Sequence, residues 1–403
     1  MATIGMEMQG GEFRQHWRAL AGATLAASIG TVGFYAFTSG AFVGPLMESG
    51  YSRAELSIAS LLISIVVALA SPFAGQLMDR FGAFPIIGVC VLGEALGFLL
   101  LGFIPVDFRA LCAAAAALAL LGVGTTPPGF ARIVSARFDA KRGLALGVMI
   151  AGPGSMAMTG PLWITALIEH SGWRAAYWTM ALLVLACGSI GLALIGRDGA
   201  RQAPKGEQPS RDRGSWAALR RPLFWLLLFA FLAPAFVGSG YLFHTITILR
   251  ERGFSPEQAA QVQALIGVAI VTGRLTSGAA VDRLPAQRVA AAIFALSGLG
   301  SALMATGNGV LAGLAALGIG LTIGAEQDLL AYLISRHFGL ASFGRLFGLA
   351  YAGLIAAAGA SPLLISTLAD WRGYEAAFVV SICGMAVSVV TLLLLPPAPR
   401  AVR

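Results

Sequence analysis

Three charged side chains lie within mostly apolar stretches of this sequence and could bind or move small ions. They are Arg274, Glu326 and Asp328. A guanidinium holds a carboxylate through two parallel hydrogen bonds. A carboxyl group that is removed from water can take up and release a proton near neutral pH. These residue types therefore indicate the binding of an anion combined with proton transfer.

The composition predicts that a lipid bilayer surrounds the elements that carry these charges. Of the 403 residues, 57% are apolar and 11% are charged, whereas soluble domains carry roughly 25% charged residues. A soluble globule of this size could not bury so much apolar side chain. A soluble enzyme, a disordered chain and a nucleic-acid-binding protein are therefore excluded, although the net charge is +8.

Polar and turn residues divide the chain into twelve apolar segments, and a transmembrane helix needs roughly 20 such residues. The predicted helices are 19–46, 54–78, 84–105, 110–136, 142–169, 174–196, 222–249, 256–281, 286–306, 309–336, 343–368 and 374–396. A β-barrel is excluded because the segments lack the alternating pattern of its strands. We therefore predict an all-α integral membrane protein.

Basic residues predict the orientation of these helices. If the N-terminus is cytoplasmic, most Lys and Arg residues fall in loops on the cytoplasmic side, and this excess predicts that both termini are cytoplasmic. The loops on the opposite side hold Arg53, Arg109, Arg174, Arg250, Arg252 and Arg372. The polar stretch 197–221 predicts a linker between an N-terminal six-helix bundle, residues 1–196, and a C-terminal six-helix bundle, residues 222–403.

The two predicted bundles are related in sequence. Gly50-Tyr51-Ser52 matches Gly253-Phe254-Ser255 at an offset of 203 residues, and each serine begins a capping box. Pro161 matches Pro362 at an offset of 201. Two parallel six-helix repeats are typical of transporters in which a site between the repeats opens alternately to either side.

One loop motif resembles the signature of the major facilitator superfamily. The motif is Gly75-x-x-x-Asp79-Arg80-x-Gly82, and its degenerate copy is Gly278-x-x-x-Asp282-Arg283. The resemblance implies the major facilitator fold and a latch, formed by Asp79, Arg80, Asp282 and Arg283, that stabilises one access state. Anchoring of the topology by Arg80 alone is the alternative.

Further segments resemble the bacterial monocarboxylate and oxalate/formate transporter branch of that superfamily. They include Gly172-Trp173-Arg174-Ala175-Ala176-Tyr177 and Asp328-Leu329-Leu330-Ala331-Tyr332. The resemblance implies a multi-pass protein of the bacterial inner membrane, and we expect a monomer. In the related transporters an arginine of the eighth helix binds the substrate carboxylate, and Arg274 occupies that place.

The predicted depth of Arg274 and Asp328 makes them candidate partners. Each lies eight residues before the end of its helix, which places both about 12 Å inside the membrane. The repeat puts Ser71 opposite Arg274 and Pro128 opposite Asp328, so the scaffold does not require either charge. We expect Arg274 to bind the anion and Asp328, with Glu326, to take the coupling proton. A permanent structural salt bridge is the alternative.

Other polar residues of the spans are further candidates. The rings of Tyr35, Tyr241 and Tyr332 suit the wall of a substrate cavity, although packing is the commoner fate of such residues. His244 could be a gate or a proton site because imidazole titrates near neutrality, and a hydrogen-bonded interfacial histidine is the alternative. Arg132 could extend to the inner surface, and Glu94 could make a polar contact with the second helix.

Sequence patterns of other function classes are absent. The sequence contains no G-x-x-x-x-G-K-[ST] loop, no clustered metal ligands and no G-x-S-x-G motif. We therefore expect no enzyme activity, no cofactor, no metal and no nucleic-acid partner. The predicted function is uptake of a small organic anion, a monocarboxylate, together with a proton. The alternatives are an organic-anion exchanger, a drug exporter and a non-transporting receptor of the same fold.

Overall fold

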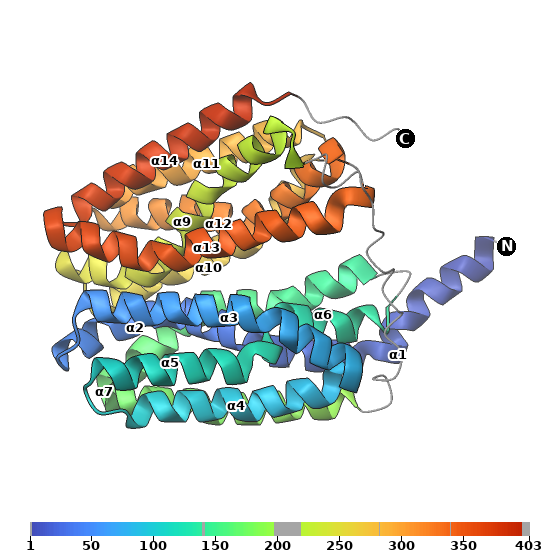
Figure 1. Ribbon diagram of the computed structural model, residues 1–403, viewed down its shortest axis with the longest axis horizontal. Coiled ribbons are helices and arrows are strands. Elements are labelled where there is room, and N and C mark those ends of the chain that lie inside the picture. The colour runs from blue at the N-terminus through green and yellow to red at the C-terminus, as the bar shows by residue number, and fades with distance from the viewer. Residues whose placement is uncertain (1, 139–141, 197–218, 282, 339, 397–403) are drawn as a thin grey trace. The chain divides into compact units, whose positions relative to one another are not determined.

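The computed structural model describes residues 2–138, 142–196, 219–281, 283–338 and 340–396 (Figure 1). Within these ranges the chain is helical and contains no strand. The N-terminal elements are α1 (Ala2–Ser28), α2 (Thr31–Glu48), α3 (Arg53–Phe81), α4 (Ala83–Phe103), α5 (Phe108–Gly122), the short 3-10 helix η1 (Val123–Thr125), α6 (Pro127–Ser135) and α7 (Arg142–Ile195). The C-terminal elements are α9 (Pro222–Glu251), α10 (Pro256–Val281), α11 (Ala286–Met304), α12 (Gly309–Phe338), α13 (Leu340–Arg372) and α14 (Tyr374–Leu394).

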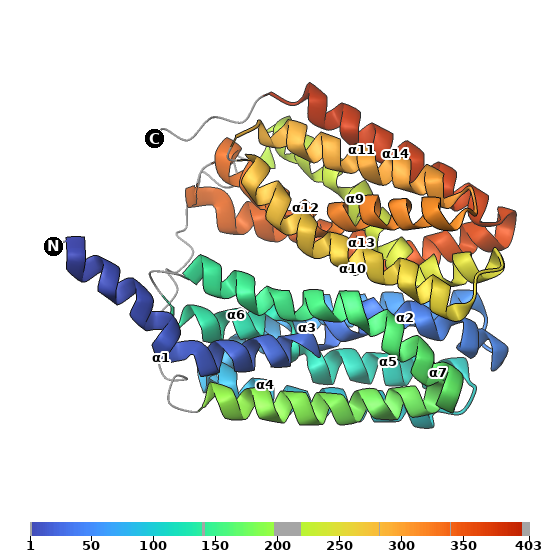
Figure 2. The ribbon, with the colours of Figure 1, turned by 180° about the vertical axis from the view of Figure 1, so that it is seen from behind.

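The helices pack as two compact units. The first unit is Met1–Glu55 with Leu62–Gly206, and the second is Leu56–Leu61 with Glu207–Arg403. In the first unit, α7 packs against α1, α2 and α4, and α4 packs against α5. In the second unit, α12 packs against α10 and α11, while α9 packs against α13 and α14 (Figures 1 and 2). Most of the predicted linker, 197–218, lies outside the described residues.

The prediction of twelve membrane-spanning helices is confirmed. Eleven apolar stretches of the described chain are long enough to cross a membrane, and one of them, Leu144–Ile195, has 52 residues. Gly172 interrupts that stretch with φ 81° and ψ 164°. Because an L-residue rarely adopts such a positive φ, this glycine allows the turn between two spans. The long stretch therefore holds the predicted helices 142–169 and 174–196.

Two predicted helices are interrupted within their length. The predicted span 19–46 consists of α1 and α2, with Gly30 extended between them at ψ 150°. The predicted span 110–136 consists of α5, η1 and α6, with Thr126 extended at ψ 155°. Pro127 explains the second break, because proline lacks an N–H group and forces the preceding residue out of the helical conformation.

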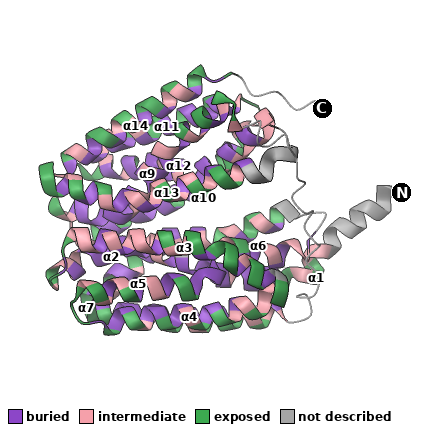
Figure 3. Cartoon of the chain, viewed as in Figure 1, coloured by how far each residue is buried: buried purple, intermediate pink, exposed green. Residues whose placement is uncertain are grey.

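The outer faces of the helices are apolar. Val89 and Phe103 of α4 and Leu394 of α14 are exposed, and exposed residues follow the outer faces of several helices in Figure 3. A soluble protein rarely exposes such extensive apolar surface. A helix in a bilayer does so because its own backbone hydrogen bonds are internal and its side chains face lipid.

Both predicted capping boxes are present. The N–H of Glu55 donates to Ser52 Oγ at 3.2 Å, and the N–H of Ser52 donates to Glu55 Oε2 at 2.8 Å. Ser255 and Gln258 make the same reciprocal pair at 3.2 and 3.0 Å. Each box satisfies two backbone donors at a helix start. The boxes therefore fix where α3 and α10 begin.

Candidate functional site

Close contact between α10 and α12 positions the charged residues of the second unit. A Cβ added to Gly320 would overlap the carbonyl oxygen of Ile266, and one added to Gly324 would overlap that of Ile270. Both glycines face residues 54 positions earlier in the chain, and the same offset pairs Asp328 with Arg274. The glycines therefore bring the two backbones together one and two turns before the charged pair, which small residues make possible.

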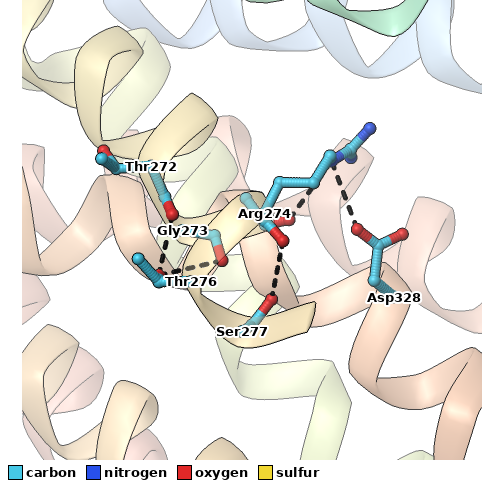
Figure 4. Close-up of polar contacts among 7 residues, drawn as sticks. Thr272, Gly273, Arg274, Thr276, Ser277 and Asp328 are labelled. Atoms are coloured by element: carbon cyan, nitrogen blue, oxygen red, sulfur yellow. Dashed lines mark hydrogen bonds and ion pairs between the residues drawn. The ribbon is translucent and has the colours of Figure 1, made fainter. Parts of the chain in front are cut away.

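The predicted ion pair between Arg274 and Asp328 is confirmed. Arg274 Nε lies 3.3 Å from Asp328 Oδ2, and the same nitrogen approaches the carbonyl oxygen of Gly324 at 3.5 Å (Figure 4). The side chain of Arg274 is 29% exposed and that of Asp328 is 51% exposed. The pair is therefore open to solvent or to a ligand at one edge.

The terminal nitrogens of Arg274 are not used by this pair. Both of its polar contacts within the described part of the chain go through Nε, and Figure 4 shows a terminal nitrogen that points away from Asp328. The nearby hydroxyls of Thr276 and Ser277 donate to carbonyl oxygens of α10. Nη1 and Nη2 together present the edge of a guanidinium that binds the two oxygens of a carboxylate.

Glu326 lies on a different side of α12 from Asp328, because residues two apart on a helix do not face each other. Its side chain is buried, with 7% of the residue exposed. Within the described residues Oε2 has no hydrogen-bond partner. Arg274 is the charged residue that acts on it electrostatically. Arg274 therefore interacts with two carboxyl groups, with that of Asp328 in direct contact and with that of Glu326 at longer range.

Tyr351 of α13 is a candidate that the sequence analysis did not identify. Its hydroxyl lies within electrostatic range of both Glu326 and Arg274, and its ring stacks on Phe347 with 6.0 Å between centroids. The repeat offers a signal, because an offset of 201 puts Ile150 opposite Tyr351. Like Arg274 and Asp328, this tyrosine therefore has no counterpart in the first unit.

His244 is fully buried in the second unit and is hydrogen-bonded at both ring nitrogens. Nε2 lies 3.0 Å from the carbonyl oxygen of Pro362, and Nδ1 lies 3.1 Å from the hydroxyl of Tyr374. A carbonyl oxygen only accepts, so Nε2 carries a hydrogen, while the Tyr374 hydroxyl can donate to Nδ1 or accept from it. Both ring nitrogens are thereby held between α13 and α14. This arrangement matches the hydrogen-bonded alternative, whereas a role as gate or proton site stays a prediction.

The three predicted cavity tyrosines lie in different surroundings. Tyr241 is buried and stacks on Phe378, with 6.4 Å between ring centroids. Tyr332 is half-buried one turn after Asp328, and the guanidinium of Arg336 lies 5.7 Å from its ring centroid. Tyr35 is half-buried in α2 of the first unit. Of the three, Tyr332 lies on the same helix face as Asp328.

The predicted latch residues are described only in part. Arg80 is exposed at the end of α3 and lies over the ring of Phe81, and Arg283 is exposed in the turn after α10. Asp282 and the side chain of Asp79 lie outside the described residues. Gly82 ends α3 with φ 89°, a conformation that favours glycine. The latch stays a prediction.

Two further charged residues make contacts that the sequence did not identify. Arg132 donates through Nη1 to the carbonyl oxygen of Gly75 on α3 at 3.1 Å, and its extension to the inner surface stays a prediction. Glu94 was expected to contact the second predicted helix. It instead contacts Thr125, at 2.7 Å, in the break after α5. A local sequence pattern does not contain this partner, because the contact depends on how α4 packs against α5.

Comparisons with known proteins identify the family of this chain. Residues 23–349 match the family model described as Major Facilitator Superfamily. The chain is 29% identical to human monocarboxylate transporter 11 over 251 residues, which are 60% of this chain and 51% of that protein. It is 25% identical to the gallate transporter of Pseudomonas putida over 391 residues, 84% of this chain and 86% of that protein. The chain thus spans about half the length of the human relative.

A third relative is multidrug resistance protein MdtG of Rahnella sp. (strain Y9602), which is 30% identical over 235 residues, 57% of this chain and 56% of that protein. Solved structures share the fold. The D-xylose-proton symporter matches with a TM-score of 0.69 and 16% identity over 95% of this chain and 98% of that one. A bacterial homologue of the lysosomal transporter Spinster, inward-facing and occupied, matches with a TM-score of 0.69 and 16% identity over 94% and 95%.

Proposed function

Because this chain belongs to the Major Facilitator Superfamily and its relatives are named as transporters, not as enzymes, we propose that it takes up a small monocarboxylate together with a proton. The protein is a multi-pass membrane protein. Its substrate class and its coupling ion are the proposed part. Two relatives are named for carboxylates, a monocarboxylate transporter and a gallate transporter.

The pair of Arg274 and Asp328 carries this proposal. Asp328 holds the guanidinium through Nε and leaves its two terminal nitrogens for a ligand. A guanidinium oriented in this way binds a carboxylate through two parallel hydrogen bonds, which lysine cannot do. Because one arginine offers one positive charge, a monocarboxylate fits better than a dicarboxylate. Tyr332 and Tyr351 lie near this pair, and we assign Tyr35 and Tyr241 to the cavity wall as well.

The same pair explains why a proton would travel with the anion. Arg274 interacts with both Asp328 and Glu326. If both carboxyl groups were ionised, a substrate carboxylate would bring a third negative charge to a single positive one. Protonation of one carboxyl removes this repulsion, so binding of the anion and binding of the proton favour each other. We assign the coupling proton to Asp328, with Glu326 as its partner.

The rest of the mechanism follows from the fold. We propose that the protein lies in the inner membrane of a bacterial cell as a monomer with both termini cytoplasmic, as its basic loops indicate. The two repeats would rock against each other to expose the site to either side. Asp79, Arg80, Asp282 and Arg283 would stabilise one of the two states, and His244 would support the packing of α9, α13 and α14.

Uptake into reconstituted vesicles tests this proposal. Labelled lactate and labelled gallate are supplied outside, with the outside more acidic than the inside. We expect uptake that collapses when the pH gradient is removed and that is lost in Arg274→Ala and Arg274→Lys. Arg288→Lys is the matched control, because Arg288 is exposed at the start of α11 in the same unit. Near-normal uptake by Arg274→Ala would contradict the proposal.

Two outcomes distinguish the alternatives. Uptake that requires unlabelled substrate inside the vesicles and ignores the pH gradient indicates an anion exchanger. Export of hydrophobic drugs without any carboxylate uptake indicates an exporter, which the similarity to MdtG would then explain. Binding without any movement of solute indicates a receptor.

A further inference from the structure

The two predicted spans that are interrupted, 19–46 and 110–136, contact each other at their breaks in the first unit. α1 and α2 are separated at Gly30, and α5 and α6 are separated between Gly122 and Thr126. A Cβ on Gly30 would overlap the carbonyl oxygen of Thr125, and a Cβ on Gly122 would overlap Oγ1 of Thr31. We call this contact the junction of the two breaks, formed by Gly30, Thr31, Gly122 and Thr125. Broken membrane helices place unpaired backbone groups at ion and substrate sites in other transporters.

The carboxyl group of Glu94 lies at this junction and is fully buried, with 0% of the residue exposed. Oε2 lies 2.7 Å from Oγ1 of Thr125. The same hydroxyl oxygen also lies 2.7 Å from the carbonyl oxygen of Gly122 and 3.0 Å from Oγ1 of Thr31. The N–H of Thr31 donates to it at 3.1 Å. Glu94 is thus connected to both helix breaks through one hydroxyl.

Counting hydrogens around Thr125 favours the neutral form of Glu94. The hydroxyl has one hydrogen, but it lies 2.7 Å from two oxygens, Oε2 of Glu94 and the carbonyl oxygen of Gly122. If Glu94 were ionised, both of these oxygens could only accept, and one short contact would have no hydrogen. If Glu94 is neutral, it donates to Thr125, and Thr125 donates to Gly122. The Thr31 hydroxyl also donates to the Gly122 carbonyl oxygen, at 3.0 Å, so the 3.0 Å contact between the Thr31 and Thr125 hydroxyl oxygens has no hydrogen. The neutral form thus leaves one such contact, whereas the ionised form leaves two.

The electrostatic surroundings agree with a neutral carboxyl. Within the described residues of the packed helices α2, α5, α6 and α7 and of η1, no cation or second carboxyl acts on Glu94; its polar partners are Thr125 and Thr31. Cys90, one turn earlier on α4, is the titratable group that its charge would reach. Oε1 is buried and has no hydrogen-bond partner in this part of the chain. An ionised carboxylate left half unsatisfied in an apolar interior is strongly disfavoured.

A metal ion does not fit this site. The oxygens of Glu94, Thr31, Thr125 and Gly122 lie in direct hydrogen-bond contact at 2.7 to 3.0 Å. Glu94 is the single ionisable group among these four residues, and the described part of the chain holds no group of three or more His, Cys, Asp or Glu side chains that could bind a metal. The group that the site can bind is therefore a proton.

The repeat shows that the fold does not require an acid at this place. Offsets of 201 to 203 residues bring Glu94 opposite Ala295, Leu296 or Ser297 of α11, none of which is ionisable. A buried acid is costly in a membrane helix and is a candidate for function when the scaffold does not need it.

We propose that Glu94 is a proton-binding site of the first unit, and that its neutral form holds the two helix breaks together. Loss of the proton leaves a carboxylate that only accepts, so the Thr125 hydrogen turns to Oε2 and the Gly122 carbonyl loses Thr125 as a donor. The α1–α2 and α5–α6 breaks then become free to move. This site is distinct from the carboxyl groups of α12, which belong to the second unit.

Infrared spectroscopy of the purified protein tests the proton directly. In the difference spectrum between neutral and alkaline pH, we expect wild type to lose the carbonyl band of a protonated carboxylic acid. Glu94→Gln lacks this band, and it remains in Glu326→Gln, the matched control for a second buried carboxyl. Spectra of wild type and Glu94→Gln that are identical in this region would overturn the proposal.

The thiol of Cys90 reports on movement of the junction, because it is buried and a Cβ on Gly124 would lie 2.7 Å from its sulfur. Cys112, Cys187 and Cys383 are first replaced by serine. We expect alkaline pH to increase labelling of Cys90 by a permeant maleimide about tenfold more in the wild-type background than with Glu94→Gln, as loss of one hydrogen bond predicts. An equal increase in both would refute the link between the proton and the junction. Neither readout needs a substrate, so both are independent of the proposed transport.

Discussion

Gly324 of α12 lies against Ile270 of α10 so closely that a Cβ on the glycine would overlap the isoleucine carbonyl oxygen. One turn further along both helices, Arg274 meets Asp328. The close approach of the two backbones therefore precedes the ion pair and sets its geometry. This relationship makes a glycine as important to the site as the charges themselves.

Gly324→Ala tests that relationship. The added methyl group pushes α12 away from α10 and costs about 1–3 kcal/mol of folding free energy, as overpacking does. We expect carboxylate uptake to fall at least about tenfold, because a shift near 1 Å strongly reduces the benefit of oriented groups. Vesicle uptake and the midpoint of thermal unfolding are measured. Gly313→Ala is the control, since its Cβ meets only a flexible leucine side chain at 3.4 Å. Equal losses in both variants would show that the effect is not local.

Asp328→Asn separates anion binding from proton coupling. The amide oxygen still accepts from Arg274, so the guanidinium keeps its orientation, but the side chain no longer takes up a proton. We expect exchange of labelled for unlabelled carboxylate to persist, while uptake driven by the pH gradient falls at least about tenfold, which corresponds to about 1.4 kcal/mol. Glu326→Gln in parallel shows whether the buried acid is needed as well. Full gradient-driven uptake by Asp328→Asn would remove this residue from the coupling step.

Tyr374→Phe tests the environment of His244. The variant removes the hydroxyl partner of Nδ1 in a fully buried imidazole, which we expect to cost about 1–3 kcal/mol of stability. If His244 is structural, the pH profile of uptake stays unchanged. Unfolding in detergent and uptake at several pH values are compared with those of the wild type. A shifted pH optimum would instead identify His244 as a proton site.

Tyr51 connects the turn before α3 to the turn before α5, outside the membrane-spanning stretches. Its hydroxyl donates to the carbonyl oxygen of Pro105 at 2.9 Å and accepts from the N–H of Asp107 at 3.3 Å. Burial raises the pKa of the Tyr51 hydroxyl above 10.0. The stability that this group contributes is therefore complete below pH 10 and is lost as the pH rises through the higher folded value.

Tyr51→Phe should lower stability by about 1 kcal/mol, to the same extent at neutral and at mildly alkaline pH. Thermal unfolding at both values checks this expectation. A penalty that disappears at mildly alkaline pH would mean that the hydroxyl of the folded protein titrates earlier than its burial predicts. The corresponding position in the repeat is Phe254, which shows that the fold itself tolerates phenylalanine there.

Local sequence patterns predict much of the architecture. Span lengths follow from runs of apolar residues, and the starts of α3 and α10 follow from Ser52 and Ser255, whose capping partners lie three residues away. The pairing of Arg274 with Asp328 follows from equal depth and from the repeat, in which neither charge has a counterpart. These features depend on short-range chemistry or on a simple count along a helix.

Contacts between helices that are far apart in sequence are seen only in the tertiary structure. Pro127 accounts locally for the break that precedes it, but the meeting of this break with Gly30 has no local signal, since Thr31 and Thr125 are 94 residues apart in sequence. Likewise, the partners of His244, the position of Tyr351 and the surroundings of Glu94 depend on which helix faces which. Sequence alone determined the spans, their caps and the charges placed within them. Packing decided which of those charges meet a partner, because a side chain's neighbours are set by the approach of helices that no local pattern encodes.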